Sequence, residues 1–459
     1  MTSSLLILVT GATGYIASRL IPRLLEAGYR VRCLAREPRR LKGRRWFRDV
    51  EVVQGDVTNP FTLPAALEGV QTAYYFVHNM SHGHGYTALE LDSARAFASA
   101  ANEAGVEHII YLGGLADPEQ HIAPHMRSRI ETGFVLRQGK VPVTEFRAGV
   151  IIGSGSISFE MIRFMTELFP IVPGPLWMKN KSQPIAIQNV IDYLLAALTN
   201  PNGRGGIFEI GGPDIMLYGD LMLGYARIRG IKRKMWLLPG IPLSFMAFGV
   251  GLMTPVPYPI AYALIHGLSA DSVVKHSEAL AIFPEVKLID FETATKDALG
   301  KTHPFHIERV WDAGGDLRRK DFGCLLEDDP SHKDSPKTSE VWVTLKHEGS
   351  FIDHREAMIC AEPKNICQAI KQLIQKSNWT SEVNDEQRVL VRIKNQIAGK
   401  KWIEWRVVSH AKNVTYMSQT VFFSPHGLPG FLYWSLLYPF HLLNFRGLIK
   451  SISKQSEPQ

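Results

Sequence analysis

Three small residues near the start of the chain, Gly11, Gly14 and Ala17, have the types and the spacing of a phosphate-binding turn. Gly11 permits a tight turn, Gly14 lets the backbone come close to a ligand, and Ala17 allows a following helix to pack closely on a strand. The free N–H groups and the dipole of that helix would face the turn, which suits a pyrophosphate. The spacing therefore predicts a dinucleotide site, with contacts at Gly11, Ala12, Thr13, Gly14, Tyr15 and Ile16.

The residues on either side of this turn have the pattern of a strand followed by a helix. Residues 5–9 are apolar and too few for a helix, which suits a strand that is buried on both faces. The helix is expected to run to about Ala27, with Gly28 as its C-terminal cap and a second strand at residues 29–34. Together these elements predict a Rossmann-type α/β fold with a doubly wound parallel sheet, and an empty structural turn is the disfavoured alternative.

The end of the second strand, Arg32-Cys-Leu-Ala-Arg36, bears on the identity of the nucleotide. NAD-binding Rossmann units usually place an acid here to hold the ribose 2′-hydroxyl, but no acid is present between residues 33 and 36. An arginine in its place suits a 2′-phosphate, and Arg36 is the first candidate, with Arg32 or Arg39 as a helper. NADP is therefore the predicted cofactor. NAD is the alternative, in which Arg36 only lies on the surface.

The phrase Thr10-Gly-Ala-Thr-Gly-Tyr-Ile16 resembles the short-chain dehydrogenase/reductase (SDR) superfamily in its extended and atypical branches. Later phrases, at residues 147–156, 183–187 and 208–214, follow the order of that superfamily, and they narrow the resemblance to atypical SDR proteins that are NmrA-like or YbjT-like. The resemblance implies that Asp56 and Val57 lie beside the adenine. It also implies that the strand ending at Val77 carries backbone past the cofactor. The alternative role for Asp56 is that of a turn residue or helix cap.

The catalytic residues of active SDR proteins are missing from their expected places. Gly113-Gly114 stands where a serine or threonine usually follows the fifth strand. Alignment of the helix at residues 121–137 on Leu136-Arg137 places Arg127 at the lysine, and Ala123 at the tyrosine, of the Tyr-x-x-x-Lys pair. Carbonyl reduction then lacks its usual general acid, for which the nearby His125 is a substitute. His125 and Arg127 are the catalytic candidates, and the chain is either an oxidoreductase or a non-catalytic NADP sensor.

Composition restricts the classes of partner. The net charge of +7 is modest, and the basic residues between Arg30 and Arg48 form either a solvated face or a phosphate-facing patch. The sequence contains no known nucleic-acid-binding motif, so the basic residues are not predicted to bind nucleic acid. The 4 cysteines form no CxxC pair and no cluster with metal-ligand spacing, which predicts reduced thiols, no metal and a cytoplasmic location.

Two apolar regions raise the question of a membrane. Five prolines interrupt residues 235–268, and residues 431–449 contain Pro439, His441, Asn444 and Arg446. Prolines break a spanning helix, and polar or charged groups are costly inside a bilayer. The sequence therefore predicts burial of both regions or peripheral contact with a membrane surface. No membrane span and no signal peptide are expected.

The 459 residues are expected to form two domains. The boundaries predicted are 1–300 for the SDR domain with its substrate region, 301–340 for a polar linker, and 341–455 for a smaller α+β domain. Strand patterns at residues 341–345, 389–393, 402–407 and 414–423, followed by an apolar closing helix, resemble a helix-grip or START-like shape, which can hold an apolar ligand. The expected substrate is small or apolar, and lipid or quinone binding by the C-terminal domain is a third functional alternative.

Overall fold

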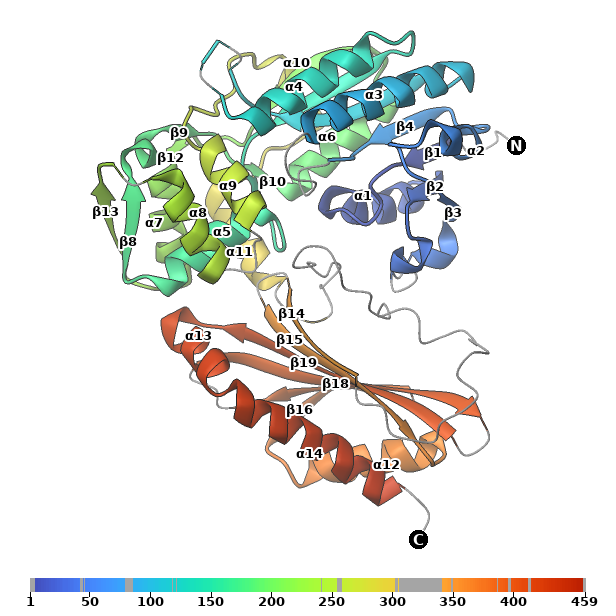
Figure 1. Cartoon of the computed structure of the whole chain (residues 1–459), viewed down its shortest axis with the longest axis vertical. Helices are drawn as coiled ribbons and strands as arrows, with labels where there is room; N and C mark the ends of the chain where they lie inside the picture. Colours follow the sequence, from blue (N-terminus) through green and yellow to red (C-terminus); the bar gives the residue numbers. More distant parts are fainter. Residues whose placement is uncertain are drawn as a thin grey trace. The chain divides into compact units, whose positions relative to one another are not determined.

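The structure is a computed structural model. It describes residues 5–41, 44, 46–78, 86–117, 119–120, 122–240, 242–253, 258–301, 304, 341–347, 350–385, 387–394, 398–411 and 414–456. The chain divides into two compact units (Figure 1). The larger contains most of residues 1–301, and the smaller contains residues 326–459 together with a few earlier segments. The predicted linker at 301–340 lies almost entirely outside the described residues.

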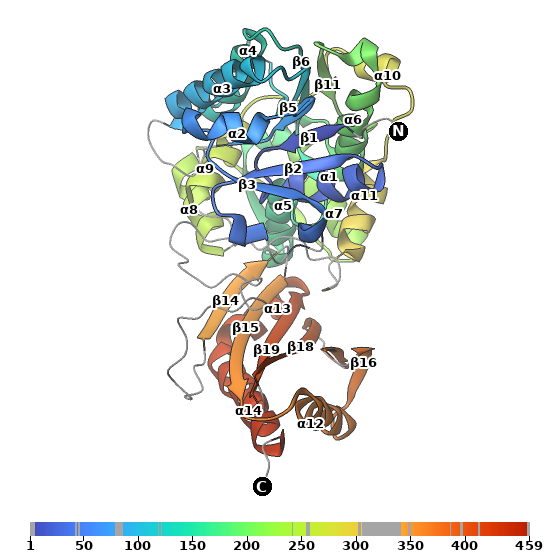
Figure 2. The same ribbon diagram turned by 90° about the vertical axis from the view of Figure 1, so that its right-hand side faces the viewer.

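A seven-stranded sheet forms the centre of the larger unit, with the strand order β11-β6-β5-β4-β1-β2-β3 (Figure 2). Every neighbouring pair in it is parallel. The chain begins at β1, extends the sheet to one side through β3 and then to the other from β4, so the topological switch point lies between β1 and β4. The Rossmann-type fold predicted from the sequence is confirmed. The strands are β1 (Leu6–Val9), β2 (Arg30–Ala35), β3 (Glu51–Gln54), β4 (Thr72–Tyr75), β5 (His108–Gly114), β6 (Val143–Ala148) and β11 (Ile207–Ile210).

Helices cover both faces of this sheet because its strands are apolar on both faces. In β1, Ile7 and Val9 join the core beneath helices α1 and α6, whereas Leu6 and Leu8 join the core beneath α2, α3 and α4. Helix α1 ends where predicted, and Gly28 follows it with a φ of 84°. These helices are α1 (Tyr15–Glu26), α2 (Leu63–Leu67), α3 (Tyr86–Glu103), α4 (Pro124–Arg137) and α6 (Ile187–Thr199).

The rest of the larger unit consists of short strand pairs and helices. The apolar region at 235–268 folds as β13, α8 and α9, and no helix among the described residues has the length and hydropathy to cross a membrane. The pairs are β7 (Ile151–Ile152) with β10 (Ile185–Ala186), β9 (Lys181–Ser182) with β12 (Met216–Leu217), and β8 (Ile171–Pro175) with β13 (Lys234–Leu238). The helices are α5 (Ile157–Leu168), α7 (Tyr218–Arg229), α8 (Leu243–Met253), α9 (Tyr258–Gly267), α10 (Glu278–Ile282) and α11 (Phe291–Gly300).

The smaller unit contains a six-stranded antiparallel sheet in the order β14-β15-β19-β18-β17-β16. Helix α12 contacts β16, β18 and α14, and α13 contacts β19 and α14, so the helices pack on the sheet and on one another (Figure 1). The strands are β14 (Val341–His347), β15 (Ser350–Ile359), β16 (Trp379–Asn384), β17 (Arg388–Ile393), β18 (Gly399–Ala411) and β19 (Val414–Pro425). The helices are α12 (Pro363–Gln375), α13 (Gly427–Leu436) and α14 (Tyr438–Ser456).

Candidate functional site

The glycine turn lies at the switch point of the parallel sheet, where Thr10 ties the ends of β1 and β4 together. The Thr10 N–H and hydroxyl both donate to the Tyr74 carbonyl, at 3.0 and 3.1 Å, and the hydroxyl oxygen accepts the Phe76 N–H at 2.9 Å. Ligands of open α/β sheets bind at this crevice, beyond the carboxyl ends of the strands. The turn thus has the position of a ligand site as well as the sequence of one.

Both glycines are required by the local backbone. Gly11 has a φ of 63°, and a Cβ added there would lie 2.7 Å from the Phe76 carbonyl oxygen. The Gly14 N–H donates to the Gly11 carbonyl at 2.7 Å, and a Cβ on Gly14 would lie 2.9 Å from that same oxygen. Such close approaches leave no room for a side chain, so the turn is a cradle that any larger residue would fill.

Two backbone donors of this turn lack an acceptor. Ala12 is fully buried, yet within the described part of the chain the N–H groups of Ala12 and Thr13 donate to no acceptor. A buried backbone N–H without a partner is rare in folded proteins, so the N–H of Ala12 indicates a ligand that supplies the acceptor, and the N–H of the half-buried Thr13 lies next to it in the turn. The first turn of α1 carries no acidic residue, which leaves the positive end of its dipole available to an anion.

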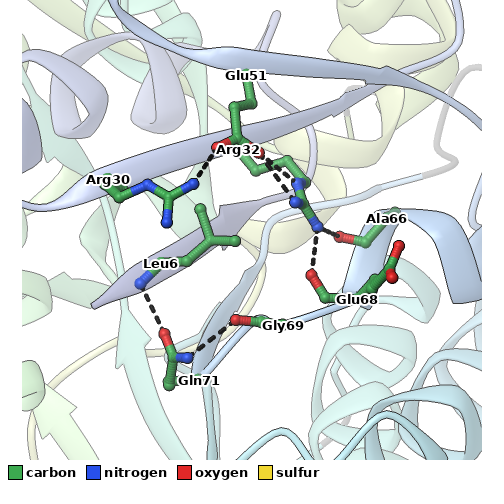
Figure 3. A network of polar contacts seen from close by, with 8 residues as sticks. All are labelled: Leu6, Arg30, Arg32, Glu51, Ala66, Glu68, Gly69 and Gln71. Carbon is green, nitrogen blue, oxygen red and sulfur yellow. Dashed lines mark hydrogen bonds and ion pairs between the residues drawn. The ribbon is translucent and has the colours of Figure 1, made fainter. Parts of the chain in front are cut away.

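Arg32 is held by the protein itself (Figure 3). Its Nε and Nη2 atoms donate to Oε2 of Glu51 at 3.0 and 2.9 Å, and its Nη1 atom donates to the carbonyl oxygens of Ala66 and Glu68 at 3.1 and 2.6 Å. Arg30 bonds the other oxygen of Glu51 at 2.6 Å. Burial alone would raise the pKa of the Glu51 carboxyl, but the bonds from the two arginines lower it. Arg32 therefore joins β2 to β3 and α2, and its donors are largely occupied.

Arg36 lies at the carboxyl end of β2, and its side chain is exposed. Its carbonyl accepts a hydrogen bond from Gln54 at 3.4 Å, while its guanidinium forms no hydrogen bond or ion pair with any residue that the structure describes. The side chain of Arg39 lies outside the described residues. Of the three arginines considered for the 2′-phosphate, Arg36 is thus the described one with uncommitted donors.

Asp56, Val57 and Val77 lie just past the ends of β3 and β4. One carboxylate oxygen of Asp56 accepts the Thr58 N–H at 3.0 Å, which is the turn role considered for this residue. Val57 is buried, and Val77 packs against the core beneath α2 and α3. The sheet order β4-β1-β2-β3 therefore brings all the predicted nucleotide contacts to the carboxyl ends of neighbouring strands, although the residues lie far apart in sequence.

Helix α4 places the two catalytic candidates, His125 and Arg127, in different surroundings. Arg127 is exposed, whereas His125 and Ser128 are buried and Arg129 is half-buried. The cation on the buried side of α4 is therefore Arg129, not Arg127. His125 and Arg129 are four residues apart and share a helix face, as the two members of Tyr-x-x-x-Lys do. That spacing was the signal in the sequence that could have identified Arg129.

Buried polar contacts join α3, α4 and the end of β4 beside His125. Glu90 in α3 is almost fully buried, and its two oxygens contact His78 Nδ1 at 2.9 Å and the Ser128 hydroxyl at 2.5 Å. Burial by itself would raise the pKa of Glu90, but the bonds from His78 and Ser128 and the charge of Arg129 lower it. Arg129 donates to the Leu112 carbonyl at 3.2 Å, which fixes α4 to β5. The contacts of Glu90 and Ser128 were not predicted, because the two residues lie on different helices.

The His125 imidazole is neutral at pH 7. Burial, then the charges of Arg129, His266 and His78, lower its pKa to about 3. A Cβ on Gly267, the last residue of α9, would lie 2.9 Å from His125 Cε1, so a glycine there makes room for the ring. A neutral imidazole has one N–H donor and one acceptor, so His125 can donate a hydrogen bond to a substrate oxygen without carrying a charge.

Gly113 and Gly114 do not simply replace a missing serine. A Cβ on Gly114 would lie 2.7 Å from Cε of Met126 in α4, and a Cβ on Gly113 would lie 3.2 Å from the Tyr111 ring. The glycines therefore let α4 approach the end of β5. Among the described residues no group of three or more His, Cys, Asp or Glu side chains could hold a metal. His82 and His84 lie outside the described residues.

Comparisons with known proteins agree with this geometry. Residues 3–202 match the model of the NmrA-like family, and residues 375–448 match that of a protein of unknown function, DUF2867. A (4-alkanoyl-5-oxo-2,5-dihydrofuran-3-yl)methyl phosphate reductase of Streptomyces griseus is 29% identical over 277 residues, covering 57% of this chain and 85% of the relative. A ceramide reductase of Caulobacter vibrioides is 26% identical over 240 residues, covering 50% and 73%.

Two solved structures share the fold of the larger unit. Citrobacter sp. triphenylmethane reductase, solved with NADP(H), has a TM-score of 0.52 at 21% identity and covers 64% of this chain and 99% of its own. The NADPH-dependent quinone oxidoreductase of Escherichia coli, solved with NADPH, has a TM-score of 0.52 at 17% identity and covers 63% and 98%. Residues 3–202 thus match the NmrA-like family and residues 375–448 match DUF2867, and the larger unit shares its fold with these two oxidoreductases.

Proposed function

We propose that the larger unit binds NADP(H) and is an oxidoreductase that acts on a small or apolar substrate. The observation that carries the proposal is the cradle at Gly11 and Gly14, with the unpartnered N–H groups of Ala12 and Thr13 at the switch point of the sheet. The relatives named as reductases support the reaction class, and the fold neighbours solved with NADP(H) or NADPH support the nucleotide.

The residues present fit this nucleotide. The N–H groups of the turn would bind the pyrophosphate, Arg36 would pair with the 2′-phosphate, and Asp56 and Val57 would flank the adenine. Tyr15, Ile16 and Val77 complete the proposed contacts. Bound NADPH supplies a hydride, and the protein supplies orientation and electrostatics. NAD is the alternative nucleotide if Arg36 does not take part.

His125 is the proposed hydrogen-bond donor to the substrate. Negative charge develops on a carbonyl oxygen during reduction, and a donor held in place before the reaction stabilises that charge. The neutral imidazole of His125 suits this role, and Arg129 would add positive charge from the same helix face. Glu90 would hold His78 and Ser128 in place around them. Arg127 has no part in this arrangement because its side chain is exposed.

A non-catalytic NADP sensor is the second candidate function. The observation that favours it is that the pKa of His125, the candidate substitute for the usual tyrosine, is lowered to about 3, because such a group is a poor proton source at pH 7. A sensor would bind NADPH with the same residues and would show no turnover. The two candidates therefore share the nucleotide site and differ only at α4.

Domain boundaries, location and partners complete the proposal. We assign residues 1–300 to the nucleotide-binding domain, 301–340 to a linker and 341–455 to the C-terminal domain. A cytoplasmic location fits Cys33 and Cys360, which form no disulfide among the described residues. Peripheral contact with a membrane is supported by exposed apolar side chains on α13 and α14, namely Leu432, Leu436, Leu437, Phe440 and Leu443.

Titration calorimetry with NADPH and NADH tests the nucleotide, and a substrate panel tests the reaction. We expect NADPH to bind at least about tenfold more tightly than NADH, since a 2′-phosphate paired with an arginine adds roughly one charge-assisted bond. Absence of heat with both nucleotides at millimolar concentration would refute the site. NADPH oxidation in the presence of quinones, lactones or apolar ketones would identify an enzyme. NADPH binding without turnover on the whole panel would favour the sensor.

A further inference from the structure

The sheet of the smaller unit carries charged and polar residues on the face beneath α14. Strand register places Arg355 beside Gln419 and Gln419 beside Trp405, while Lys401 lies opposite Phe423. Because side chains alternate along a strand, Asp353 shares the face of Arg355, and all these residues point to the same side. A charged row in the middle of a covered sheet is unusual, since buried charges need partners.

The Asp353–Arg355 pair satisfies its own charge. Arg355 donates from Nε to Oδ1 of Asp353 at 2.6 Å and from Nη2 to Oδ2 at 2.9 Å, and both side chains are fully buried. The Arg355 Nη1 atom donates to the Leu442 carbonyl of α14 at 3.1 Å, and the Tyr438 hydroxyl donates to Asp353 at 2.9 Å. One negative and one positive charge therefore cancel here, with their hydrogen bonds made.

Gln419 is satisfied as well. Its Oε1 atom accepts the Trp405 Nε1–H at 3.0 Å, and its Nε2 atom donates to the Phe445 carbonyl at 3.1 Å. These bonds tie β18, β19 and α14 together. Asp353, Arg355, Gln419 and Trp405 thus form a network whose hydrogen bonds are made and whose charges cancel.

Lys401 is the exception. Its side chain is buried, with 4% of the residue exposed, and it forms no hydrogen bond or ion pair with any described residue. The Nζ atom lies 4.7 Å from the centre of the Phe445 ring. A cation–π contact replaces only part of the hydration that a buried ammonium loses, and the Asp353 carboxylate, whose negative charge also acts on Lys401 and raises its pKa, is already paired with Arg355. Asp353, Arg355 and Lys401 together therefore carry one excess positive charge. Burial lowers the pKa of Lys401 to about 8, which still leaves it mostly protonated at pH 7.

His441 of α14 is a second unfinished group beside Lys401. Its Nε2 atom is buried and has no hydrogen-bond partner among the described residues. Burial, followed by the charge of Lys401, lowers its pKa to about 4 in spite of a hydrogen bond to the Tyr433 backbone and the charge of Asp353, so the ring is neutral at pH 7. The ring lies 5.8 Å from that of Phe445, the same ring that Lys401 contacts. One unpaired cation and one unpaired imidazole nitrogen therefore adjoin a common aromatic side chain.

The surroundings of these two groups are aromatic. Trp434 stacks on Phe423 at 5.3 Å between ring centres and lies 5.5 Å from the His441 ring. Tyr433 lies 4.9 Å from His441. These rings pack against one another, and such apolar surroundings favour an apolar ligand body, while the excess positive charge favours an anionic end.

We propose that Lys401 and His441 form a binding site in the smaller unit for an apolar carboxylic acid, whose carboxylate pairs with the Lys401 ammonium. The ligand class follows from the two observations together. The unpaired charge of Lys401 requires an anionic group, and the surrounding aromatic rings favour an apolar chain or ring attached to that group. His441 takes up a proton as the carboxylate arrives, because a nearby negative charge favours the imidazolium. The site is independent of the nucleotide, so NADPH affinity does not bear on it.

Titration calorimetry of the full chain with octanoate at pH 7 tests this site, with 1-octanol and acetate as matched probes. We expect octanoate to bind at least tenfold more tightly than octanol, which lacks the charge, or acetate, which lacks the chain. Absence of octanoate binding would overturn the proposal. Equal affinity for octanoate and octanol would contradict the proposed pairing of the carboxylate with Lys401. Equal affinity for octanoate and acetate would contradict the proposed binding of an apolar chain.

Lys401→Met should weaken octanoate at least tenfold and leave octanol unchanged. Lys400→Met is the matched control, because Lys400 is exposed on the opposite face of the same strand, and it should bind like the wild type. Unchanged octanoate affinity in a folded Lys401→Met protein would overturn the proposal. If that variant does not fold, the affinity of the wild-type protein for octanoate, measured between pH 7 and 10, tests the proposal instead. It should fall at least tenfold as Lys401 loses its proton, and a constant affinity refutes the assignment.

Discussion

The two ends of strands β1, β2 and β3 differ in how their polar groups are satisfied. Toward the amino ends, Arg30 and Arg32 bond Glu51, and Arg32 also bonds two carbonyls near α2 (Figure 3). At the carboxyl ends, the N–H groups of the buried Ala12 and the half-buried Thr13 lack acceptors among the described residues, and the Arg36 guanidinium has no described partner. One sheet thus has a closed end that stabilises the fold and an open end that can bind a ligand.

This difference shows that the type of a residue does not determine its role. Arg32 lies in β2 and Arg36 directly follows it, four residues later, and the sequence alone made either a candidate for the 2′-phosphate. The donors of Arg32 are occupied within the protein because Glu51 lies opposite it on β3 and the end of α2 supplies carbonyl oxygens. Substitutions at the two ends should therefore separate stability from binding.

The largest expected effect is at the open end. Gly14→Val should abolish NADPH binding, with a loss beyond about a thousandfold, or roughly 4 kcal/mol, because the side chain would fill the turn. Titration calorimetry measures the loss. Gly300→Val, at an exposed helix end with open space around it, is the control that should bind normally. Wild-type affinity in Gly14→Val would place the nucleotide elsewhere.

Acid should act on the open end through His125. Its pKa is about 3 in the folded protein and near 6.5 when unfolded, so the unfolded state binds more protons between these values. Stability from this group is therefore complete above pH 6.5 and is lost as the pH falls toward 3, by an amount on the order of 4 kcal/mol. Denaturant unfolding of wild type and His125→Gln from pH 7 to 4 measures the difference. Parallel pH curves for the two proteins would contradict this expectation.

At the closed end, Arg32→Met should lower the free energy of unfolding by about 3 kcal/mol, because Glu51 and two carbonyls lose a charged donor. NADPH affinity should stay within about twofold of wild type, since Arg32 has no part in the proposed site. Urea unfolding and calorimetry give the two numbers. The control is Arg95→Met, which removes only an exposed pair with Asp92 and should change stability by less than about 1 kcal/mol.

The smallest expected effect belongs to Arg36. Arg36→Ala should weaken NADPH by about 2 kcal/mol through loss of a charge-assisted bond, while NADH affinity and stability barely change. Competition binding with both nucleotides measures the difference. Equal losses of affinity for NADPH and NADH would show that Arg36 does not bind the 2′-phosphate, and that Arg36 and Arg32 do not differ in the way proposed.

Local signals were sufficient for most of the fold. The glycine turn was foreseen because strand, turn and helix are adjacent in sequence and each needs particular residue types. The centre of strand β15, Asp353 to Arg355, was not predicted because it is charged, and a charged segment does not have the apolar alternation of a buried strand. The ion pair that makes the burial tolerable is seen only in three dimensions.

The catalytic helix shows a different limit. Its existence was predicted, but alignment on Leu136-Arg137 assigned the lysine position to Arg127. Burial shows that His125, Ser128 and Arg129 form the inner face. Helical positions two residues apart lie on nearly opposite sides, so alignment alone could not show that Arg127 is exposed and Arg129 half-buried. The partner of Ser128, Glu90, lies on another helix and left no local signal.

The register of the smaller sheet has a consequence for how that unit folds. In β14–β15 and β18–β19 the pairing starts between close neighbours, His347 with Ser350 and Ala411 with Val414, so both hairpins are local. The pairing of β15 with β19 instead joins distant residues, Phe351 with Phe423. Chain entropy makes such non-local closure slow, and the closure also has to desolvate the charges of β15. We therefore expect the meeting of the two hairpins, not the formation of either, to set the folding rate.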